Sequence, residues 1–261
     1  MHAIILAAGQ GTRLKKYTEN LPKGMLNFAG KTIIERQIEM YRRCGIEKVI
    51  IVTGFAAHTI QYPDVTYYHN ADFATTNMVE SFMMTRREFD EDTILSYSDV
   101  LFSEELLRGM IAEESDFVVA VDDNWKAYWK KRYGRIDFDT ESLMIDDKGN
   151  ICSLGLENPP FSEIDARYIG LLKFSEAGLR KITELWDRNY ETYLDRPWKQ
   201  SGKKIRQAYM TDLLQALIES GETIKTKRFQ NGWLEFDTNE DYENACQWLK
   251  DGTIGELLEI E

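Results

Sequence analysis

Residues 2–26 read HAIILAAGQGTRLKKYTENLPKGML and carry the clearest fold signal in the sequence. Its apolar run, residues 3–6, has the pattern of a buried strand and stops at a loop almost without side chains, AAGQG at residues 7–11. Backbone N–H groups in such a loop can approach a ligand closely and point together at one phosphate. Two cations follow, Arg13 and then Lys23 behind the conformationally restricted Pro22. The stretch therefore predicts a polyphosphate site.

The complete string is more specific than any of its parts. A Gly-x-Gly loop alone is often only a tight turn, and a surface Arg or Lys is usually just solvated. The residues that carry the wider pattern are Leu6, Ala7, Ala8, Gly9, Gly11, Thr12, Arg13, Leu14, Pro22, Lys23, Met25 and Leu26. In these residues the chain resembles the nucleotidyltransferases that condense a nucleoside triphosphate with a phosphorylated small molecule, the family of sugar-phosphate nucleotidyltransferases and phosphocholine cytidylyltransferases.

The resemblance implies roles for these residues. Arg13 and Lys23 would be catalytic. The residues expected to bind the nucleotide in this stretch are Leu6, Ala7, Ala8, Gly9, Gly11 and Thr12.

Composition indicates one folded unit. The chain has 261 residues and 43% hydrophobic content, enough for a buried core, and no linker, repeat or low-complexity segment divides it. We expect a single nucleotidyltransferase domain over residues 1–261, with a nucleotide-binding half at residues 1–122. Residues 123–261 would form the half that binds the acceptor and supplies the second metal ligand.

Charge and hydropathy exclude several partners. The formal net charge of -12 argues against a nucleic-acid partner, because phosphate contacts require a basic surface. No apolar run is long enough to cross a bilayer, and the chain does not open with a basic segment followed by an apolar stretch. We therefore expect a cytoplasmic protein without a membrane partner. The sequence leaves homo-oligomerisation open.

Apolar periodicity predicts alternating strands and helices in the first half, as in a parallel α/β sheet. The expected strands there cover residues 3–6, 49–52, 66–69, 93–97 and 117–121, and the expected helices cover residues 33–44, 78–87 and 104–112. Further strands are expected at residues 143–145, 151–154, 167–174, 224–228 and 233–236, with helices at 176–186, 210–219 and 240–249. The predicted fold is α/β and Rossmann-like: a mixed, mostly parallel sheet flanked by helices, of the nucleotide-diphospho-sugar transferase type, with an acceptor-side elaboration.

Two aspartates follow expected strands and are candidate Mg²⁺ ligands. Asp99 ends the strand at residues 93–97, and a carboxylate at that edge of a parallel sheet is a hard oxygen ligand of the kind Mg²⁺ prefers. Asp237 follows the strand at residues 233–236, and the family's closing D-T-x-x-D string is matched by Asp237, Thr238 and Asp241. The alternative for each is a turn or helix-capping aspartate. Ser98 stands where the family usually has glycine and is counted with the nucleotide-binding residues.

Polar residues at positions 70–81 lie between a strand and a helix. Asn77 has the position of a helix cap, and Asn70 or Asn77 could also hydrogen-bond the base or ribose. Sugar-nucleotide enzymes of the family carry Gly-Thr-Ala near this point, whereas this chain has TTNM at residues 75–78. This difference favours the cytidylyltransferase branch over a hexose-1-phosphate enzyme.

Aromatic and basic residues gather at positions 123–135, in an otherwise acidic chain. Such a run commonly forms a helix with its aromatics in the core, but its cations also suit an anionic acceptor. Together with the strings at residues 163–170, 209–217 and 231–233, it resembles the cytidylyltransferases that act on phosphoglutamine and on phosphonates. The candidate acceptor-binding residues are Lys126, Arg132, Arg167, Tyr209 and Glu235.

The resemblance implies a reaction without a general base. An oxygen of the acceptor phosphate or phosphonate attacks the α-phosphorus of CTP, and pyrophosphate leaves. Such an acceptor is already ionised near neutral pH, so alignment and charge neutralisation by Arg13, Lys23 and Mg²⁺ carry the catalysis. The expected acceptors are an amino-acid phosphate such as phosphoglutamine, a phosphonate, or phosphocholine.

Missing motifs argue against other enzyme classes. A dinucleotide-binding oxidoreductase needs a third glycine where Leu14 stands, a kinase-like NTPase needs Gly-Lys-Ser/Thr, and a related glycosyltransferase needs Asp-x-Asp after the fourth strand. Two alternatives stay open. One is a sugar-1-phosphate nucleotidyltransferase using UTP or dTTP, and the other is a non-catalytic nucleotide sensor.

Overall fold

The computed structural model describes residues 1–260. Its strands are β1 (His2–Ala7), β2 (Asn27–Phe28), β3 (Lys31–Thr32), β4 (Lys48–Thr53), β5 (Val65–His69), β6 (Thr93–Tyr97), β7 (Val100–Phe102), β8 (Phe117–Asp122), β9 (Glu141–Ile145), β10 (Ile151–Glu157), β11 (Arg167–Phe174), β12 (Lys225–Phe229) and β13 (Trp233–Glu235). Its helices are α1 (Lys15–Thr18), α2 (Ile33–Arg43), α3 (Met78–Met83), α4 (Glu104–Ile111), α5 (Trp125–Tyr133), α6 (Glu176–Tyr190), α7 (Met210–Glu219) and α8 (Asn239–Lys250). Short 3-10 turns at Thr12–Leu14 and Lys23–Met25 carry Arg13 and Lys23.

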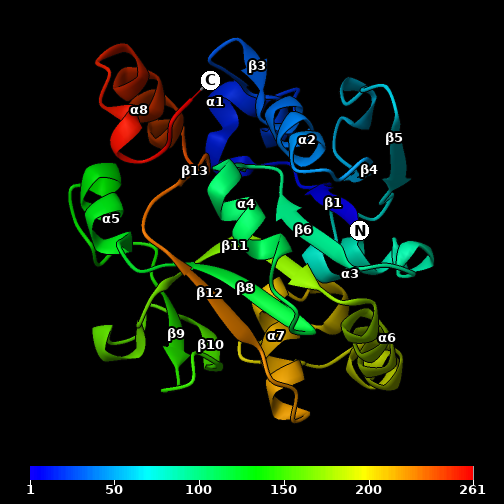
Figure 1. Ribbon diagram of the computed structural model, residues 1–261. Coiled ribbons are helices and arrows are strands. Elements are labelled where there is room, and N and C mark those ends of the chain that lie inside the picture. Colours follow the sequence, from blue (N-terminus) through cyan, green and yellow to red (C-terminus); the bar gives the residue numbers. More distant parts are fainter. Residues whose placement is uncertain (261) are drawn as a thin grey trace.

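Seven strands form the main sheet, in the order β12-β8-β11-β6-β1-β4-β5 (Figure 1). Strand β11 runs antiparallel to both of its neighbours, and the other neighbouring strands run parallel. The chain adds β4 and β5 on one side of β1 and then crosses to β6 on the other side, so the strand order reverses at β1. Sheets of this kind bind ligands at the carboxyl edge beside such a reversal. The expectation of a mixed, mostly parallel sheet flanked by helices is confirmed.

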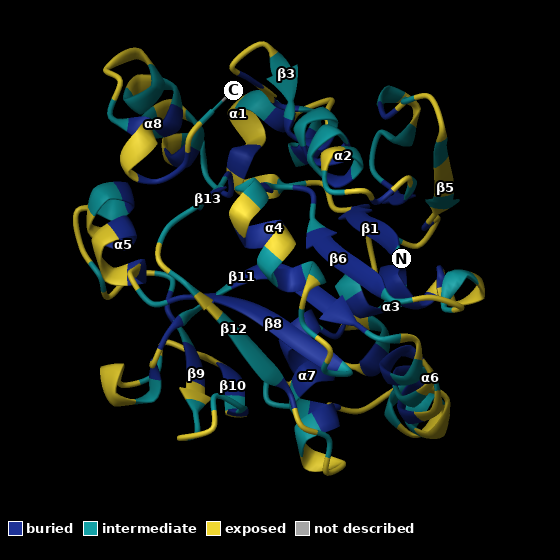
Figure 2. Cartoon of the chain, viewed as in Figure 1, coloured by how far each residue is buried: buried dark blue, intermediate teal, exposed yellow. Residues whose placement is uncertain are grey.

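Two apolar layers attach the helices to the sheet. Helices α2, α4 and α8 pack on the face that receives Ala3 and Ile5 of β1, while α3, α6 and α7 pack on the face that receives Ile4 and Leu6. Successive strand residues point to opposite faces, so a strand covered on both sides is apolar throughout. Figure 2 shows β1 and β8 buried along their length, and β6 is buried up to its last residue, Tyr97. The first apolar run of the sequence therefore lies in the centre of the molecule.

Most expected elements are present, with shifted ends. The helix expected at residues 78–87 is shorter, because α3 ends at Met83 and a separate 3-10 turn covers Arg86–Glu88. Thr85 follows the end of α3 and donates its hydroxyl to the Phe82 carbonyl oxygen at 2.7 Å. A threonine side chain that bonds the backbone in this way competes with regular helical bonding.

Strand β7 was not expected, and it joins the two halves of the chain. It forms an antiparallel pair with β13, in which Glu235 faces Val100 and Trp233 faces Phe102. Beyond this pair, the Phe236 N–H donates to the Asp99 carbonyl oxygen at 2.9 Å. The pairing fixes the backbone at Asp99 beside the segment that leads to Asp237.

Within residues 1–260, no helix is long and apolar enough to cross a bilayer.

Candidate active site

A pocket of about 260 Å³ opens at the carboxyl edge of the sheet, beside the strand reversal at β1. It is lined by Leu6, Ala8, Gly9, Gly11, Thr12, Arg13, Lys23, Phe73, Thr76, Asn77, Met78, Ser81, Tyr97, Ser98 and Asp99. The loop after β1, the two 3-10 turns, the start of α3 and the end of β6 therefore meet in one cavity. Ala7, which was also expected here, is the last residue of β1 and is buried in the core.

Gly11 shapes the wall of this pocket by leaving room for Lys23. Its backbone is left-handed, with φ 66°, a conformation that glycine adopts without strain. A Cβ atom at this position would collide with the aliphatic part of the Lys23 side chain. The glycine loop therefore admits the lysine alongside it, which explains why both residues belong to one sequence string.

Lys23 lies between the two candidate metal ligands. Its Nζ is 2.9 Å from Asp99 Oδ2 and also donates a hydrogen bond to Asp237 Oδ1. The other Asp237 oxygen, Oδ2, is 2.6 Å from Nη2 of Arg13. The four side chains, two cations and two carboxylates, thus form one cluster at the pocket.

The geometry around Asp237 shows that it is not the cap of α8. Thr238 is the cap: its Oγ1 accepts from the Asp241 N–H at 3.2 Å, and Asp241 Oδ2 accepts from the Thr238 N–H at 2.7 Å. The same Asp241 oxygen accepts from the Asp237 N–H at 3.1 Å. The capping box therefore holds the backbone of Asp237, which leaves the Asp237 carboxylate to Lys23 and Arg13.

Burial and charge act against each other in this cluster. Burial on its own lowers the pKa of the Lys23 ammonium, but the Asp99 and Asp237 carboxylates outweigh it and raise the pKa overall. Burial also raises the pKa of the Asp237 carboxyl, which is only 3% exposed, despite the opposing effect of Lys23. Lys23, Asp99 and Asp237 are thus largely buried charges that compensate one another, and Arg13 meets Asp237 from the exposed side.

The donor set at this point fits a magnesium ion. Asp99 and Asp237 offer carboxylate oxygens, which are the hard ligands that Mg²⁺ prefers, and a cation already lies between them. Residues 1–260 contain no group of three or more His, Cys, Asp or Glu side chains placed to hold a metal. Mg²⁺ commonly binds through one or two carboxylates and completes its octahedron with phosphate oxygens and water. Two carboxylates beside a phosphate loop match that pattern.

The two asparagines have different positions. Asn70 is buried and its Nδ2 donates to Thr76 Oγ1 and Ser81 Oγ, each at 2.9 Å, so its amide holds the loop that leads to α3. Asn77 lines the pocket and accepts from the Met78 N–H at 2.9 Å, as expected of a helix cap. Ser98 also lines the pocket, and its N–H donates to the Leu6 carbonyl oxygen at 3.2 Å.

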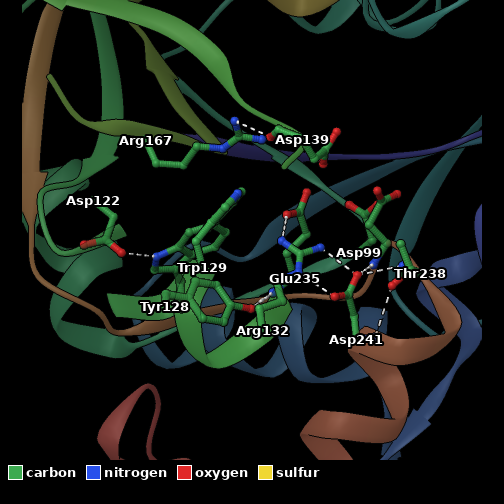
Figure 3. Close-up of polar contacts among 12 residues, drawn as sticks. Asp99, Asp122, Tyr128, Trp129, Arg132, Asp139, Arg167, Glu235, Thr238 and Asp241 are labelled. Atoms are coloured by element: carbon green, nitrogen blue, oxygen red, sulfur yellow. Dashed lines mark hydrogen bonds and ion pairs between the residues drawn. The ribbon is translucent and has the colours of Figure 1, made fainter. Parts of the chain in front are cut away.

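Arg132 and Glu235 bind each other. Arg132 makes two hydrogen bonds to Asp241, from Nε at 2.5 Å and from Nη2 at 2.6 Å, and its Nη1 donates to Glu235 Oε2 (Figure 3). Arg132 is 4% exposed, so its guanidinium is an internal partner of the α8 cap. Burial alone raises the pKa of the Glu235 carboxyl, but the Arg132 and Arg167 guanidinium groups lower it overall.

The other acceptor candidates are distributed around the second half. Arg167 donates from Nη1 to the Asp139 carbonyl oxygen at 3.1 Å, and its guanidinium lies 4.6 Å from the centre of the Trp129 ring (Figure 3). Lys126 is exposed on α5, with its ammonium 5.6 Å from the centre of the Trp125 ring. Tyr209 precedes α7, and Lys203 lies over its ring at 5.0 Å. Among these three, Arg167 is the residue beside Glu235.

Comparison with known proteins identifies the family. A family profile described as the MobA-like NTP transferase domain matches residues 3–168. The chain belongs to this family. It is 32% identical to the CTP:phosphoglutamine cytidylyltransferase of Campylobacter jejuni, over 93% of this chain and 98% of that protein. It is 26% identical to the UTP–glucose-1-phosphate uridylyltransferase AglF of Haloferax volcanii, over 97% of this chain and 98% of that protein.

A solved structure supports the fold. The CTP:phosphocholine cytidylyltransferase of Streptococcus pneumoniae aligns with a TM-score of 0.72 at 20% identity, over 95% of this chain and 98% of that chain. The protein is therefore a nucleotidyltransferase, and its family implies a nucleoside triphosphate and a phosphorylated acceptor as substrates. Nucleotidyltransferases of this family typically require a divalent metal.

Two further residues belong to the nucleotidyltransferase site by position. Asp139, in the loop between α5 and β9, lies 3.6 Å from Arg13, measured from Oδ1 to Nη1. Phe73 lines the nucleotide pocket. Neither stands in a recognisable string, and only the folded chain brings them to the glycine loop. No sequence pattern marks Asp139, because its position depends on a long-range contact in which Arg167 donates a hydrogen bond to the Asp139 carbonyl oxygen.

Proposed function

We propose that this nucleotidyltransferase is a Mg²⁺-dependent cytidylyltransferase. It condenses CTP with a small phosphate or phosphonate acceptor, giving a CMP-linked product and pyrophosphate. The acceptor class includes an amino-acid phosphate such as phosphoglutamine, a phosphonate and phosphocholine. The observation that carries the proposal is the cluster of Lys23, Arg13, Asp99 and Asp237 beside the glycine loop, in a chain similar to the phosphoglutamine enzyme over nearly its whole length.

The protein groups act by position and charge. The loop at residues 8–11 would offer its backbone N–H groups to the triphosphate, while Arg13, exposed at the loop's edge, would hold the β- and γ-phosphates. Lys23 would bridge the α-phosphate and the acceptor, which aligns two anions that otherwise repel each other. Asn70, Asn77 and Ser98 would shape the base and ribose side of the pocket.

Asp99 and Asp237 would hold the metal. A bound Mg²⁺ supplies polarisation of the phosphate oxygens and neutralises part of the charge that develops in the transition state. The acceptor oxygen is ionised near neutral pH, so no residue of the chain has to remove a proton from it.

On the acceptor side, Arg167 would contact the acceptor. Arg132 and Glu235 form an ion pair with each other, and we propose that this pair acts by supporting Asp237 through Asp241. We propose Lys126 and Tyr209 as further acceptor-binding residues.

The main rival is a sugar-1-phosphate nucleotidyltransferase that uses UTP or dTTP. It is favoured by the similarity to the uridylyltransferase AglF, whereas the TTNM sequence at residues 75–78 lacks the Gly-Thr-Ala of sugar enzymes. A non-catalytic nucleotide sensor would not need both carboxylates and the lysine between them.

The decisive experiment measures pyrophosphate release. The protein is incubated with Mg²⁺ and each of CTP, UTP, dTTP and ATP, combined with phosphoglutamine, phosphocholine, 2-aminoethylphosphonate or glucose-1-phosphate. We expect release with CTP and at least one of the first three acceptors, and a CMP-linked product by mass spectrometry. Release with only glucose-1-phosphate and UTP or dTTP would contradict the proposal, and no release with any pair would favour the sensor.

A further inference from the structure

Gln37 is a polar residue on the apolar face of α2. The other residues that α2 buries are Ile33, Ile34, Ile38 and Tyr41, and Gln37 itself is 1% exposed. A buried amide destabilises a protein unless its N–H and C=O groups find hydrogen-bond partners. An apolar side chain of the same size would fill this place in the core without that requirement. The partners of Gln37 therefore show what the amide does.

The amide of Gln37 bonds the end of β6 and the start of β7. Its Nε2 donates to the Tyr97 carbonyl oxygen at 2.7 Å and to the Val100 carbonyl oxygen at 2.5 Å. Its Oε1 accepts from Ser96 Oγ at 3.3 Å. Both N–H groups and the oxygen of the amide are thus engaged. The two carbonyl groups flank the turn that carries Asp99, so one side chain holds both ends of that turn.

Two other elements hold the same turn by backbone hydrogen bonds. The Ser98 N–H donates to the Leu6 carbonyl oxygen of β1 at 3.2 Å. The Asp99 carbonyl oxygen accepts from the Phe236 N–H at 2.9 Å, directly after β13. Consecutive carbonyl groups of an extended chain point to opposite sides, so the next carbonyl group is held from the side of α2. Of these three supports, Gln37 is the one made by a side chain, and it is not among the residues that line the nucleotide pocket.

Helix α2 also packs against the turn that carries Lys23. The residue after Lys23 is Gly24, and a Cβ atom there would lie 2.6 Å from Ile34 Cδ1 and 2.9 Å from Ser98 Cβ. The backbone next to Lys23 therefore touches α2 and the Asp99 turn at once, without room for one more methyl group. Lys23 Nζ lies 2.9 Å from Asp99 Oδ2. Helix α2 is thus a common support for the lysine and the carboxylate.

We propose that Gln37 is a positioning residue of the active site. Its amide holds the turn at residues 97–100, so that the Asp99 carboxylate keeps its place beside Lys23 and Asp237. The inference rests on the proposed function, because it requires Asp99 to hold the metal. Gln37 acts through the backbone, from outside the pocket. Loss of a group that orients a metal ligand typically lowers metal affinity or activity by about 10- to 100-fold, so the effect belongs in the Mg²⁺ requirement.

The test replaces Gln37 and measures the Mg²⁺ concentration that gives half-maximal pyrophosphate release from CTP. Gln37→Met keeps nearly the same length and volume but removes both N–H groups. Gln37→Asn is a milder second variant, with its amide on a chain one carbon shorter. The control is Ile38→Ala, because Ile38 is the next buried residue of α2 and is 4% exposed. That change leaves a cavity, which destabilises the protein without removing a hydrogen bond to residues 96–100.

We expect Gln37→Met to raise the Mg²⁺ concentration for half-maximal activity by about tenfold or more. The KM for CTP at saturating Mg²⁺ should stay close to the wild-type value, because the residues that line the pocket are unchanged. Gln37→Asn should shift the Mg²⁺ requirement in the same direction by a smaller factor. Ile38→Ala should lower the Tm but keep the wild-type Mg²⁺ requirement. Folded, active Gln37 variants with the wild-type Mg²⁺ requirement would overturn the inference and leave the proposed function standing.

Mn²⁺ binding without nucleotide, followed by electron paramagnetic resonance, shows whether the effect passes through Asp99. Gln37→Met should weaken Mn²⁺ binding by about tenfold when Asp99 is present and hardly at all in Asp99→Asn. An equal loss in both backgrounds would overturn the inference, because Gln37 would then act on another part of the site. A wild-type protein that binds Mn²⁺ but releases no pyrophosphate would overturn the proposed function alone, and one that does neither would overturn both.

Discussion

Lys23 lies between Asp99 and Asp237. Its ammonium satisfies both carboxylates, and Gly11 lets the side chain pass along the phosphate loop. A bound metal would take over the same oxygens, so Lys23 would be free to turn toward the α-phosphate and the acceptor. In the proposed mechanism, Lys23 would thus both compensate the two carboxylates and supply a positive charge for catalysis.

Lys23→Ala tests this role directly. Loss of one preorganised charge in a site of this kind typically lowers the rate by about 10²- to 10³-fold, so we expect a decrease of that order in kcat. In the ligand-free protein the same change should strengthen Mg²⁺ binding, because the ammonium no longer competes for the carboxylates; Mn²⁺ titration followed by electron paramagnetic resonance measures it. Lys16→Ala is the control, since Lys16 pairs with Glu243 on the surface. A variant with near-normal kcat would reject the catalytic role.

Sequence and structure agree at the residues of the opening string and diverge where contacts are long-range. The β1 run, the glycine loop and Pro22-Lys23 form a local pattern, so they could be recognised in the sequence. The sequence could not show whether Asp237 caps the helix or is free to bind a metal, because that depends on Thr238 taking the capping position. The sequence also did not predict that Arg132 binds Asp241, because Asp241 lies 109 residues further along the chain. An arginine in a basic run carries no sign of which carboxylate it meets.

At the scale of elements, the loop between β5 and α3 is held from the second half of the chain. The Arg206 side chain donates from Nη2 to Asp72 Oδ2 at 2.8 Å and from Nε to Glu80 Oε1 at 3.1 Å. Its backbone carbonyl oxygen also accepts from the Asn77 N–H at 3.0 Å. Asn77 and the neighbouring Phe73 line the nucleotide pocket. The segment before α7 therefore positions one wall of the pocket.

Arg206→Ala should loosen that wall without touching the reacting groups. We expect the KM for the nucleotide to rise by about two- to fivefold with kcat nearly unchanged, because a partly exposed ion pair is worth about 1 kcal/mol or less. Arg206→Lys should restore part of the affinity, since lysine can reach one of the two carboxylates. Arg196→Ala provides the comparison, as Arg196 donates to the Thr192 carbonyl oxygen and stacks on Tyr193. A fall in kcat with a constant KM would contradict the role of Arg206 in supporting this wall of the pocket.

The strand that the sequence did not predict, β7, is a short element. Strand β7 has three residues, too few to show an alternating pattern, and it exists because β13 pairs with it. Long apolar runs such as β8 and amphipathic helices such as α7 carry their own signal and were found with nearly the observed limits. The pairing that brings the second half of the chain to the site is thus a feature with little local signal.

At the scale of the whole molecule, the site joins the two ends of the chain. The loop after β1 supplies Arg13 and the 3-10 turn after Pro22 supplies Lys23, while Asp237 precedes the last long helix. The sheet itself takes strands from both halves, with β11 between β6 and β8 (Figure 1). Ligand binding at such a junction should stabilise the molecule as a unit, because the nucleotide and metal would contact segments from both ends.

Thermal unfolding measures this coupling. CTP with Mg²⁺ at about 100 times its dissociation constant should stabilise the folded state by about 2.7 kcal/mol. For a chain of this size that corresponds to a rise in Tm of roughly 5–10 °C. EDTA should remove most of the rise, and Asp237→Asn should do the same with Mg²⁺ present, because the second carboxylate is gone. Asp137→Asn, an exposed change in the loop after α5, should keep the full increment. A full Mg²⁺-dependent increment in Asp237→Asn would mean that the metal binds without the C-terminal segment, and the two ends of the chain would then be coupled by protein contacts alone.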